Sequence, residues 1–178
     1  MIKKFEIRNS GFTLIELLIY AALFVIIGAA ASSFFIQVSN LAETSRRSRE
    51  ALDNARTAMS VITQEIKHAT TVYTPASTFG GSPGQLSLET TRDLPADEDT
   101  TYVDFYVDDE GIYIKRESQG AQLITSEKID VTQLQFIYLD GSTGEPAVQI
   151  SLTVEYADQI LGPKTPVSLE STASLRSY

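Results

Sequence analysis

The chain has 178 residues, a length typical of a single ordinary domain. It carries 14 Lys and Arg against 23 Asp and Glu, a formal charge of −9, and this acidic balance argues against direct binding of phosphate or nucleic acid as the main activity. It contains no cysteine, which excludes disulfides and cysteine-ligated zinc sites.

The first element is a short basic segment followed by a long apolar run. Lys3, Lys4 and Arg8 precede the run, which covers residues 12–38 and holds one charged side chain, Glu16. About 20 apolar residues suffice to cross a bilayer, and a helix is the form in which a single span satisfies its own backbone. The sequence therefore predicts a membrane-spanning helix over residues 12–38.

The charges that flank this run give no clear orientation. The three cations before it place the N-terminus in the cytoplasm by the positive-inside rule, but Arg46, Arg47 and Arg49 follow the run closely. Charge counting alone therefore leaves the topology open.

The helix is predicted to continue through residues 39–69 as an amphipathic segment. No Gly or Pro occurs between Gly28 and Pro75, and small or apolar residues recur at a spacing of three or four. These residues are Leu41, Ser45, Ser48, Leu52, Ala55, Met59, Ile62, Ile66 and Ala69. A helix over residues 12–69 would measure about 87 Å. Packing of this stripe against the chain's own sheet is favoured over a coiled coil, since two stripe positions are serine.

Gly28 interrupts the helix and has two interpretations. Glycine in a helix interior costs about 1 kcal/mol relative to alanine. It either permits close approach of a neighbouring helix, which we favour, or marks a point at which the helix loosens.

Residues 70–178 predict a head of antiparallel β-structure. Strand signals occur at residues 70–74, 85–90, 102–107, 112–116 and 121–125, with loops at 75–84 and 91–100. The strands at 102–107 and 112–116 flank residues 108–111 and predict a hairpin with a four-residue loop.

The last third of the chain has the clearest alternation. Three sets of residues each share one face: Thr132, Leu134, Phe136 and Tyr138; Val148, Ile150, Leu152, Val154 and Tyr156; Val167, Leu169, Ser171, Ala173 and Leu175. A turn at residues 140–144 and a loop at 157–166 join them, which implies antiparallel neighbours with one buried face. The sequence thus predicts an α+β fold in which a long N-terminal helix packs on an antiparallel sheet.

Residues that could carry catalysis do not form a workable set. Residues 80–84, Gly-Gly-Ser-Pro-Gly, match the nucleophile-elbow pattern around Ser82, but Pro83 lacks the N–H that the oxyanion hole requires. The only histidine, His68, precedes the serine, whereas that fold places it last. We expect no catalytic residue, no cofactor and no enzymatic activity.

Two acidic clusters, residues 97–99 and 108–110, lie in predicted loops. Calcium takes six to eight oxygen ligands from several positions around a turn, and neither cluster has the EF-hand spacing. We expect a solvated acidic surface and no metal site, with calcium binding as the alternative.

Residues 11–16, Gly-Phe-Thr-Leu-Ile-Glu, resemble the processing site of type IV prepilins and of the pseudopilins of type II secretion. The resemblance implies that prepilin peptidase cuts between Gly11 and Phe12, that residues 1–11 are a leader, that Phe12 is then N-methylated, and that Glu16 serves assembly. The processed chain would carry 11 basic and 22 acidic residues, a formal charge of −11.

The position of Glu16 agrees with such a role. A carboxylate inside a membrane helix costs about 2.5–3.5 kcal/mol and therefore needs a partner or a function. Cleavage would create an amine at Phe12, and we expect Glu16 to pair with that amine of a neighbouring subunit. In the alternative, Glu16 lies at the edge of the membrane and is merely solvated.

The rest of the chain resembles the J-type minor pseudopilins and the W-type minor pilins. The matching residues are Met59, Ile62, Glu65 and Ile66 in the helix, Leu134, Gln135, Phe136 and Tyr138 in a strand, and Ala173 to Arg176 near the end. The resemblance implies a filament subunit whose partners are prepilin peptidase, other pilin or pseudopilin subunits, an inner-membrane assembly platform and, before assembly, membrane lipid. It implies a single-pass protein of the inner membrane, with the leader on the cytoplasmic side and the head, residues 70–178, outside, which then enters an extracytoplasmic filament.

A secretory signal peptide is the competing interpretation of the N-terminus. Residues 29–31, Ala-Ala-Ala, would allow cleavage that releases a soluble protein beginning at Ser32. Against it, the apolar run continues to Val38 and Glu16 interrupts its front. The alternative function is a membrane-anchored or secreted binding protein that does not polymerise.

Overall fold

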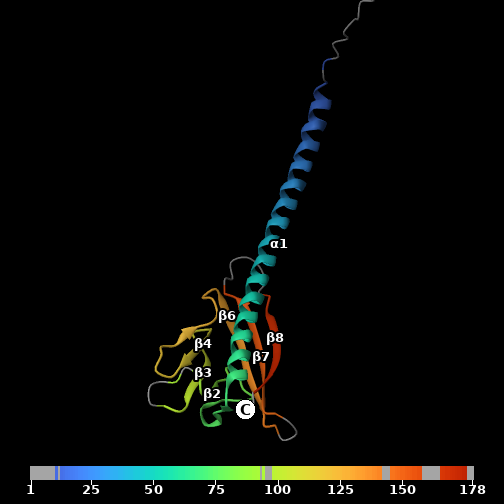
Figure 1. The fold of residues 1–178 in the computed structure, drawn as a ribbon. Helices are drawn as coiled ribbons and strands as arrows, with labels where there is room; N and C mark the ends of the chain where they lie inside the picture. The colour runs from blue at the N-terminus through green and yellow to red at the C-terminus, as the bar shows by residue number, and fades with distance from the viewer. Residues whose placement is uncertain are drawn as a thin grey trace, which may run out of the picture. The chain divides into compact units, whose positions relative to one another are not determined.

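The computed structural model describes residue 11 and residues 13–92, 94, 98–141, 145–157 and 165–175. The chain divides into two compact units, Met1–Glu43 and Thr44–Tyr178. Helix α1 (Leu14–His68) contributes to both units. The second unit also contains the strands, which Figure 1 shows around the C-terminal part of α1.

Helix α1 confirms the single long helix predicted from the sequence. It begins two residues after the predicted start and ends one residue before the predicted end. It is uninterrupted because no proline occurs within it and its one glycine, Gly28, is tolerated. After Ala69 the β-favouring residues Thr70 to Val72 follow, and the chain turns into the first strand.

The strands form two antiparallel sheets. The first has the order β1-β2-β3-β4-β5 and the second the order β6-β7-β8. Their bounds are β1 (Thr71–Val72), β2 (Leu86–Thr90), β3 (Thr101–Asp108), β4 (Gly111–Arg116), β5 (Gln122–Leu123), β6 (Ile129–Leu139), β7 (Ala147–Tyr156) and β8 (Val167–Ser174). A short 3-10 helix, η1 (Thr74–Ala76), lies between β1 and β2. The predicted α+β class is confirmed, although the head holds two sheets where the pattern suggested one.

The core of the second unit lies between α1 and the two sheets. The buried helix residues are Ala51, Ala55, Ala58, Met59, Ile62 and Ile66. They belong to one cluster with strand residues of both sheets, among them Leu86, Phe105, Leu134, Phe136, Ile150 and Leu152. Each fully buried side chain of this size contributes about 1.5–3 kcal/mol, so this single interface accounts for much of the head's stability.

The buried stripe of α1 differs from its prediction at the N-terminal end. Ala55, Met59, Ile62, Ile66 and Ala69 are buried as expected. Leu41 and Ser45 are exposed and Leu52 is half-buried, while Ala51 and Ala58 take buried positions. Alanine has no atoms beyond Cβ and so lets the helix backbone approach the sheets closely, which favours the Ala51–Ala55–Ala58 face over the one that carries Leu52.

Polar contacts fix α1 on the sheets at several points. Arg116 of β4 forms a partly buried ion pair with Glu65. The Asn54 Oδ1 atom accepts a hydrogen bond of 2.9 Å from the backbone N–H of Ser126. Because each of these contacts joins the helix to a specific strand or loop, they set its register along the sheets.

The β3–β4 hairpin has a two-residue turn, and the predicted four-residue loop is wrong. Asp108 pairs with Gly111, so the turn consists of Asp109 and Glu110. Both have positive φ, 43° and 61°, as a type I′ turn requires. Pattern reasoning missed the turn because it is usually formed by Asn-Gly or Asp-Gly.

A β-bulge in β6 overturns the placement of Thr132. Val131 pairs with Val154 and Gln133 with Thr153, so Thr132 is an extra residue between them. Thr132 is therefore exposed instead of sharing the buried face of Leu134 and Phe136. Its Oγ1 donates a hydrogen bond of 3.2 Å to the carbonyl oxygen of Thr153.

The alternation predicted for β7 and β8 is confirmed. Val148, Ile150, Leu152 and Val154 are buried, and Ala173 and Leu175 are buried beside them. The predicted turn at 140–144 and loop at 157–166 lie mostly outside the described residues.

The loop between η1 and β2 covers the outer edge of β6. The backbone N–H groups of Gly80 and Gly84 donate to the carbonyl oxygens of Phe136 and Leu134 at 2.9 and 2.7 Å. The Ser82 Oγ atom accepts a hydrogen bond of 3.2 Å from the N–H of Leu134. This loop satisfies backbone groups that would otherwise be left at a sheet edge.

The close approach of this loop to β6 should require glycine at position 84. A Cβ atom at Gly84 would lie 3.1 Å from both the Leu134 carbonyl oxygen and the Phe136 Cδ2 atom, whereas one at Gly81 would meet nothing within 4 Å. We expect G84A to destabilise the head by about 1–3 kcal/mol and G81A to leave it almost unchanged. Urea unfolding of the full chain in detergent micelles, followed by tyrosine fluorescence, measures both; equal stability of the two variants would contradict the prediction.

Candidate functional site

The N-terminus of α1 is capped by Thr13. The backbone N–H of Glu16 donates to the carbonyl oxygen of Thr13 at 3.1 Å and to its Oγ1 at 3.3 Å. The N–H of Leu17 donates to the same carbonyl oxygen at 3.2 Å. Thr13 and Glu16 have the Thr-x-x-Glu spacing of a capping box, so the segment that opens the apolar run also encodes the start of the helix.

Glu16 lies in the first turn of α1 and is half-buried. The hydroxyl of Tyr20, one turn further along, donates a hydrogen bond of 3.3 Å to Glu16 Oε1. The first turn favours a carboxylate because the helix dipole is positive there. The structure thus brings Glu16 together with Thr13 and Tyr20, two residues that the sequence analysis did not single out. Their spacings of three and four residues from Glu16 could have identified them.

The rest of the first unit presents apolar side chains outward. The large apolar residues from Leu14 to Val38 are between 47% and 80% exposed. Helix α1 is long and apolar enough to cross a membrane, and none of its most apolar 18-residue window is buried in the chain itself. Such a surface needs lipid or other helices around it.

Gly28 lies on this exposed part of α1. A Cβ atom there would meet nothing within 4 Å, and its carbonyl oxygen accepts a hydrogen bond of 2.8 Å from Ser32 Oγ. The chain itself therefore does not require glycine here. Of the two interpretations of Gly28, packing against a neighbouring helix would explain the residue, and it stays a prediction.

The residues of the predicted processing site are only partly described. Gly11 is exposed and precedes the helix. Phe12, Lys3, Lys4 and Arg8 lie outside the described residues. The predicted cut between Gly11 and Phe12 and the methylation of Phe12 therefore stay predictions.

The residues considered for catalysis have structural contacts. Ser82 binds the edge of β6, as described above. The Nδ1 atom of His68 lies 3.1 Å from Nη1 of Arg92, and its carbonyl oxygen accepts a hydrogen bond from Thr90 Oγ1 at 3.3 Å. Both contacts hold the end of α1 against the end of β2.

The acidic residues of the β3–β4 turn line a polar hollow. It has a volume of about 610 Å³ and is lined by Asp109, Glu110, Glu127 and Asp130, among others. Within residues 98–141 and the other described ranges, no three His, Cys, Asp or Glu side chains converge as a metal site requires. The hollow explains where the acidic surface lies; calcium binding gains no support from it.

Comparison with known families gives one match. Residues 7–32 match the model of the prokaryotic N-terminal methylation motif. Comparison with curated proteins and with solved structures gives no match. The matched segment contains Gly11, Thr13, Glu16 and Tyr20, the residues around the start of α1.

The match identifies the N-terminal segment as one typical of type IV pilin-like proteins, which are substrates of prepilin peptidase. It confirms that part of the resemblance seen in the sequence. The likeness to J-type and W-type subunits rests on residues 59–176, which no comparison covers, and it stays a prediction.

Loss of the Thr13 hydroxyl should loosen the first turn of α1. Removing an N-cap side chain costs about 0.5–2 kcal/mol, and 1 kcal/mol corresponds to about a fivefold change in an equilibrium. We therefore expect T13A to accelerate hydrogen exchange at the Glu16 amide about fivefold in detergent micelles, and T13S, which keeps the hydroxyl, to exchange like the unaltered chain. Identical exchange in T13A would show that the backbone contact alone holds the turn.

Proposed function

We propose that the chain is a minor pilin or pseudopilin, a structural subunit of a filament of the type IV pilus class in a pilus, a type II secretion system or a DNA-uptake machine. The observation that carries the proposal is the arrangement around Glu16. A methylation motif coincides with the start of a helix whose large apolar side chains face outward from Leu14 to Val38 and whose first turn holds a carboxylate. The helix serves as the assembly element, and no enzymatic activity is proposed.

The position of Gly11 supports processing by prepilin peptidase. A peptidase needs an accessible, non-helical peptide bond, and the helix begins at Leu14. Gly11 is exposed and has open space around its Cα. We propose that the cut follows Gly11, that residues 1–11 are removed and that the new amine of Phe12 is methylated.

Glu16 retains the capacity to bind that amine. A carboxylate offers about four acceptor sites, and the Tyr20 hydroxyl occupies one of them. Its remaining sites suit a cationic donor, which binds a carboxylate about twice as strongly as a neutral donor. We propose that Glu16 binds the Phe12 amine of a neighbouring subunit, because this pairing would neutralise both charges in an apolar environment.

The outward apolar surface of α1 could be buried in two environments in succession, first lipid and then other helices. Before assembly, residues 14–38 would span the inner membrane with the N-terminus in the cytoplasm and the head outside. After assembly by the inner-membrane platform, the helices of other pilin or pseudopilin subunits would replace lipid around the same surface. Both environments bury apolar side chains, so transfer between them needs no refolding of the helix.

The assignment as a minor subunit of the J or W type rests on the sequence pattern. In the fold, its residues at 59–66 lie in α1, those at 134–138 in β6, and Ala173 and Ser174 in β8, while Arg176 lies outside the described residues. The relevant measurement is the stoichiometry of the chain in filaments from its native host. A few copies per filament support a minor subunit, and a chain that forms the bulk of the filament contradicts it.

Processing should leave Phe12 as the first residue. We expect mass spectrometry of the protein from its native host to find N-methylated Phe12, and we expect G11V to retain residues 1–11 because a branched side chain replaces the small one at the cut. An N-terminus at Ser32 would identify a signal peptide, and a chain beginning at Met1 would exclude processing; either result rejects the proposal.

Loss of the Glu16 charge should block assembly while cleavage continues. In E16Q the amide oxygen can still accept from Tyr20, so the substitution removes the charge and little else. We expect E16Q to be cleaved normally but to be at least tenfold depleted in sheared filaments. Y20F keeps the carboxylate and removes the contacting hydroxyl, and should assemble normally. Normal incorporation of E16Q would support the alternative in which Glu16 is merely solvated.

A further inference from the structure

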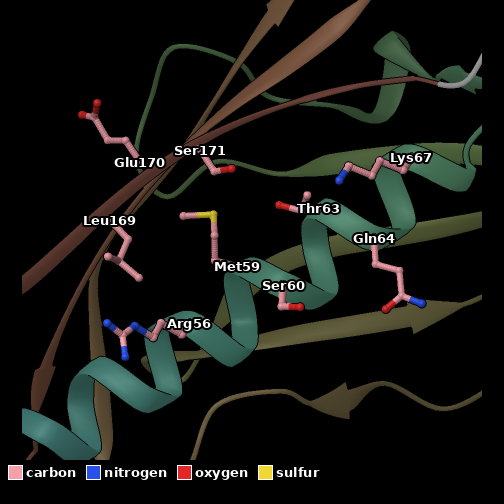
Figure 2. A pocket seen from close by; sticks show the side chains of 9 residues that line it. All are labelled: Arg56, Met59, Ser60, Thr63, Gln64, Lys67, Leu169, Glu170 and Ser171. Carbon is pink, nitrogen blue, oxygen red and sulfur yellow. The ribbon is translucent and has the colours of Figure 1, made fainter.

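A groove runs between α1 and strand β8. Its volume is about 500 Å³, and Arg56, Met59, Thr63 and Lys67 of the helix line one side. Leu169 and Ser171 of β8 line the other, as Figure 2 shows. The groove lies entirely within the second unit of the chain.

The outer edge of β8 borders this groove. Among the described residues, β8 pairs with β7 alone. The Leu175 N–H donates to the Pro146 carbonyl oxygen at 2.9 Å, in register with the ladder. Antiparallel pairs alternate, so the backbone groups of Ser168, Glu170, Thr172 and Ser174 point away from β7. Within the described part of the chain, this edge forms hydrogen bonds with β7 alone.

The two edges of the β6-β7-β8 sheet differ in whether a described segment covers them. The loop around Ser82 covers the edge of β6, as shown above. Strand β8 has eight residues, contains no Pro or Lys and carries one charge, Glu170. Sheet edges of this length are normally blunted by charges, proline or a covering segment. An edge that carries a single charge, no proline and no described covering segment is suited to accept another strand.

The charged residues of the groove indicate which kind of strand could bind there. Figure 2 shows Arg56 and Lys67 at opposite ends of the groove; Glu170 also lines it, but its carboxylate is directed away from the two cations. The Glu170 carboxylate accepts from Ser151 Oγ at 3.5 Å and therefore lies over β7. Asp53 lies 4.0 Å from Arg56, but both side chains are largely exposed and such a pair contributes little. The charged side chains that face the groove are therefore the two basic ones, in a chain of formal charge −9.

The spacing of the two cations matches a strand. Arg56 and Lys67 are 11 residues apart in α1, about 16 Å along the helix axis. Residues i and i+4 of a strand share a face and lie about 13 Å apart. Acidic side chains at i and i+4 would therefore reach both cations, and an apolar residue at i+2 would lie near Met59 and Leu169.

We propose that the groove binds an extended acidic segment of a partner protein, which adds to β8 as a fourth strand of its sheet. The backbone of the segment pairs with the outward groups of Ser168, Glu170, Thr172 and Ser174. Its carboxylates contact Arg56 and Lys67. This interaction surface goes beyond the proposed filament role, and it holds whether or not the chain is processed or polymerises.

A synthetic peptide provides the probe. Fluorescein-labelled Thr-Glu-Thr-Val-Thr-Glu-Thr with blocked termini carries carboxylates at i and i+4 around a valine. A matched peptide has lysine in place of both glutamates. Fluorescence anisotropy with the full chain in detergent micelles should show binding of the acidic peptide at least tenfold tighter than that of the lysine peptide. Equal binding of the two peptides, or no binding of either, would overturn the proposal.

Variants of Glu170 isolate the backbone contact. E170P removes an N–H that points away from β7, so the β7–β8 ladder keeps its hydrogen bonds. E170T removes the same charge and keeps the N–H. We expect E170P to weaken binding of the acidic peptide at least tenfold and E170T to leave it unchanged or tighter, with the same far-UV circular dichroism for both. Equal affinity of the two variants would overturn strand addition.

The double variant R56Q/K67Q tests the charge. It should lower affinity for the acidic peptide at least tenfold and abolish the preference over the lysine peptide; retention of the preference would overturn the assigned chemistry.

Analytical ultracentrifugation of the full chain tests whether a second copy of the chain, instead of a partner protein, binds at β8. Self-association that E170P abolishes would show that a second copy covers β8, which contradicts the proposal, whereas a concentration-independent sedimentation coefficient supports it.

Discussion

The structure depends on one constraint: the apolar surface of α1 must be buried, and its two parts achieve this differently. Between Ala51 and Ile66 a single stripe of small and apolar side chains packs on the sheets. From Leu14 to Val38 apolar side chains face outward all round, and no described part of the chain covers them. A helix that is apolar all round is stable only inside lipid or among other helices. The partners of residues 14–38 are therefore part of what makes this region stable.

Glu16 is the exception on that surface, and its position limits its cost. The first turn of a helix is where a carboxylate gains most from the dipole, and here Thr13 satisfies the Glu16 N–H while Tyr20 donates to the carboxylate. These contacts stabilise the helix start but leave the charge in place. A glutamine could make the same two contacts without the cost of a charge in an apolar region. The helix dipole contributes about 0.3–1 kcal/mol, less than the about 2.5–3.5 kcal/mol that a carboxylate costs inside a membrane, so the helix start alone does not offset the charge. The proposed cationic partner would offset the rest.

Features of this fold that arise from local sequence periodicity were predicted from the sequence, and features that depend on tertiary contacts were not. Helix α1 and the alternation in β7 and β8 are local periodicities, and they were predicted to within a few residues. The turn at Asp109 and Glu110 and the bulge at Thr132 depend on backbone conformation and on the register of a partner strand, which no local pattern contains. The buried position of Ala51 depends on how closely the helix approaches the sheets. The contacts around Glu16 were readable from spacing, whereas the groove beside β8 arises only from the tertiary fold.

The second unit has its own core, so the stability of the head does not depend on how the apolar residues 14–38 are buried, although both regions contain part of α1. Ile62, Phe105 and Phe136 are fully buried within the second unit, so its stability does not rely on the environment of residues 14–38. The proposed transfer of residues 14–38 from lipid to helical neighbours would leave the packing of the sheets and the outer edge of β8 unchanged. Conversely, a ligand at β8 binds backbone that is already ordered by β7, so little conformational entropy is lost from the chain on binding. The surface proposed for assembly and the groove proposed for strand binding would therefore change by substitution independently of each other, since they share one helix but no buried residue.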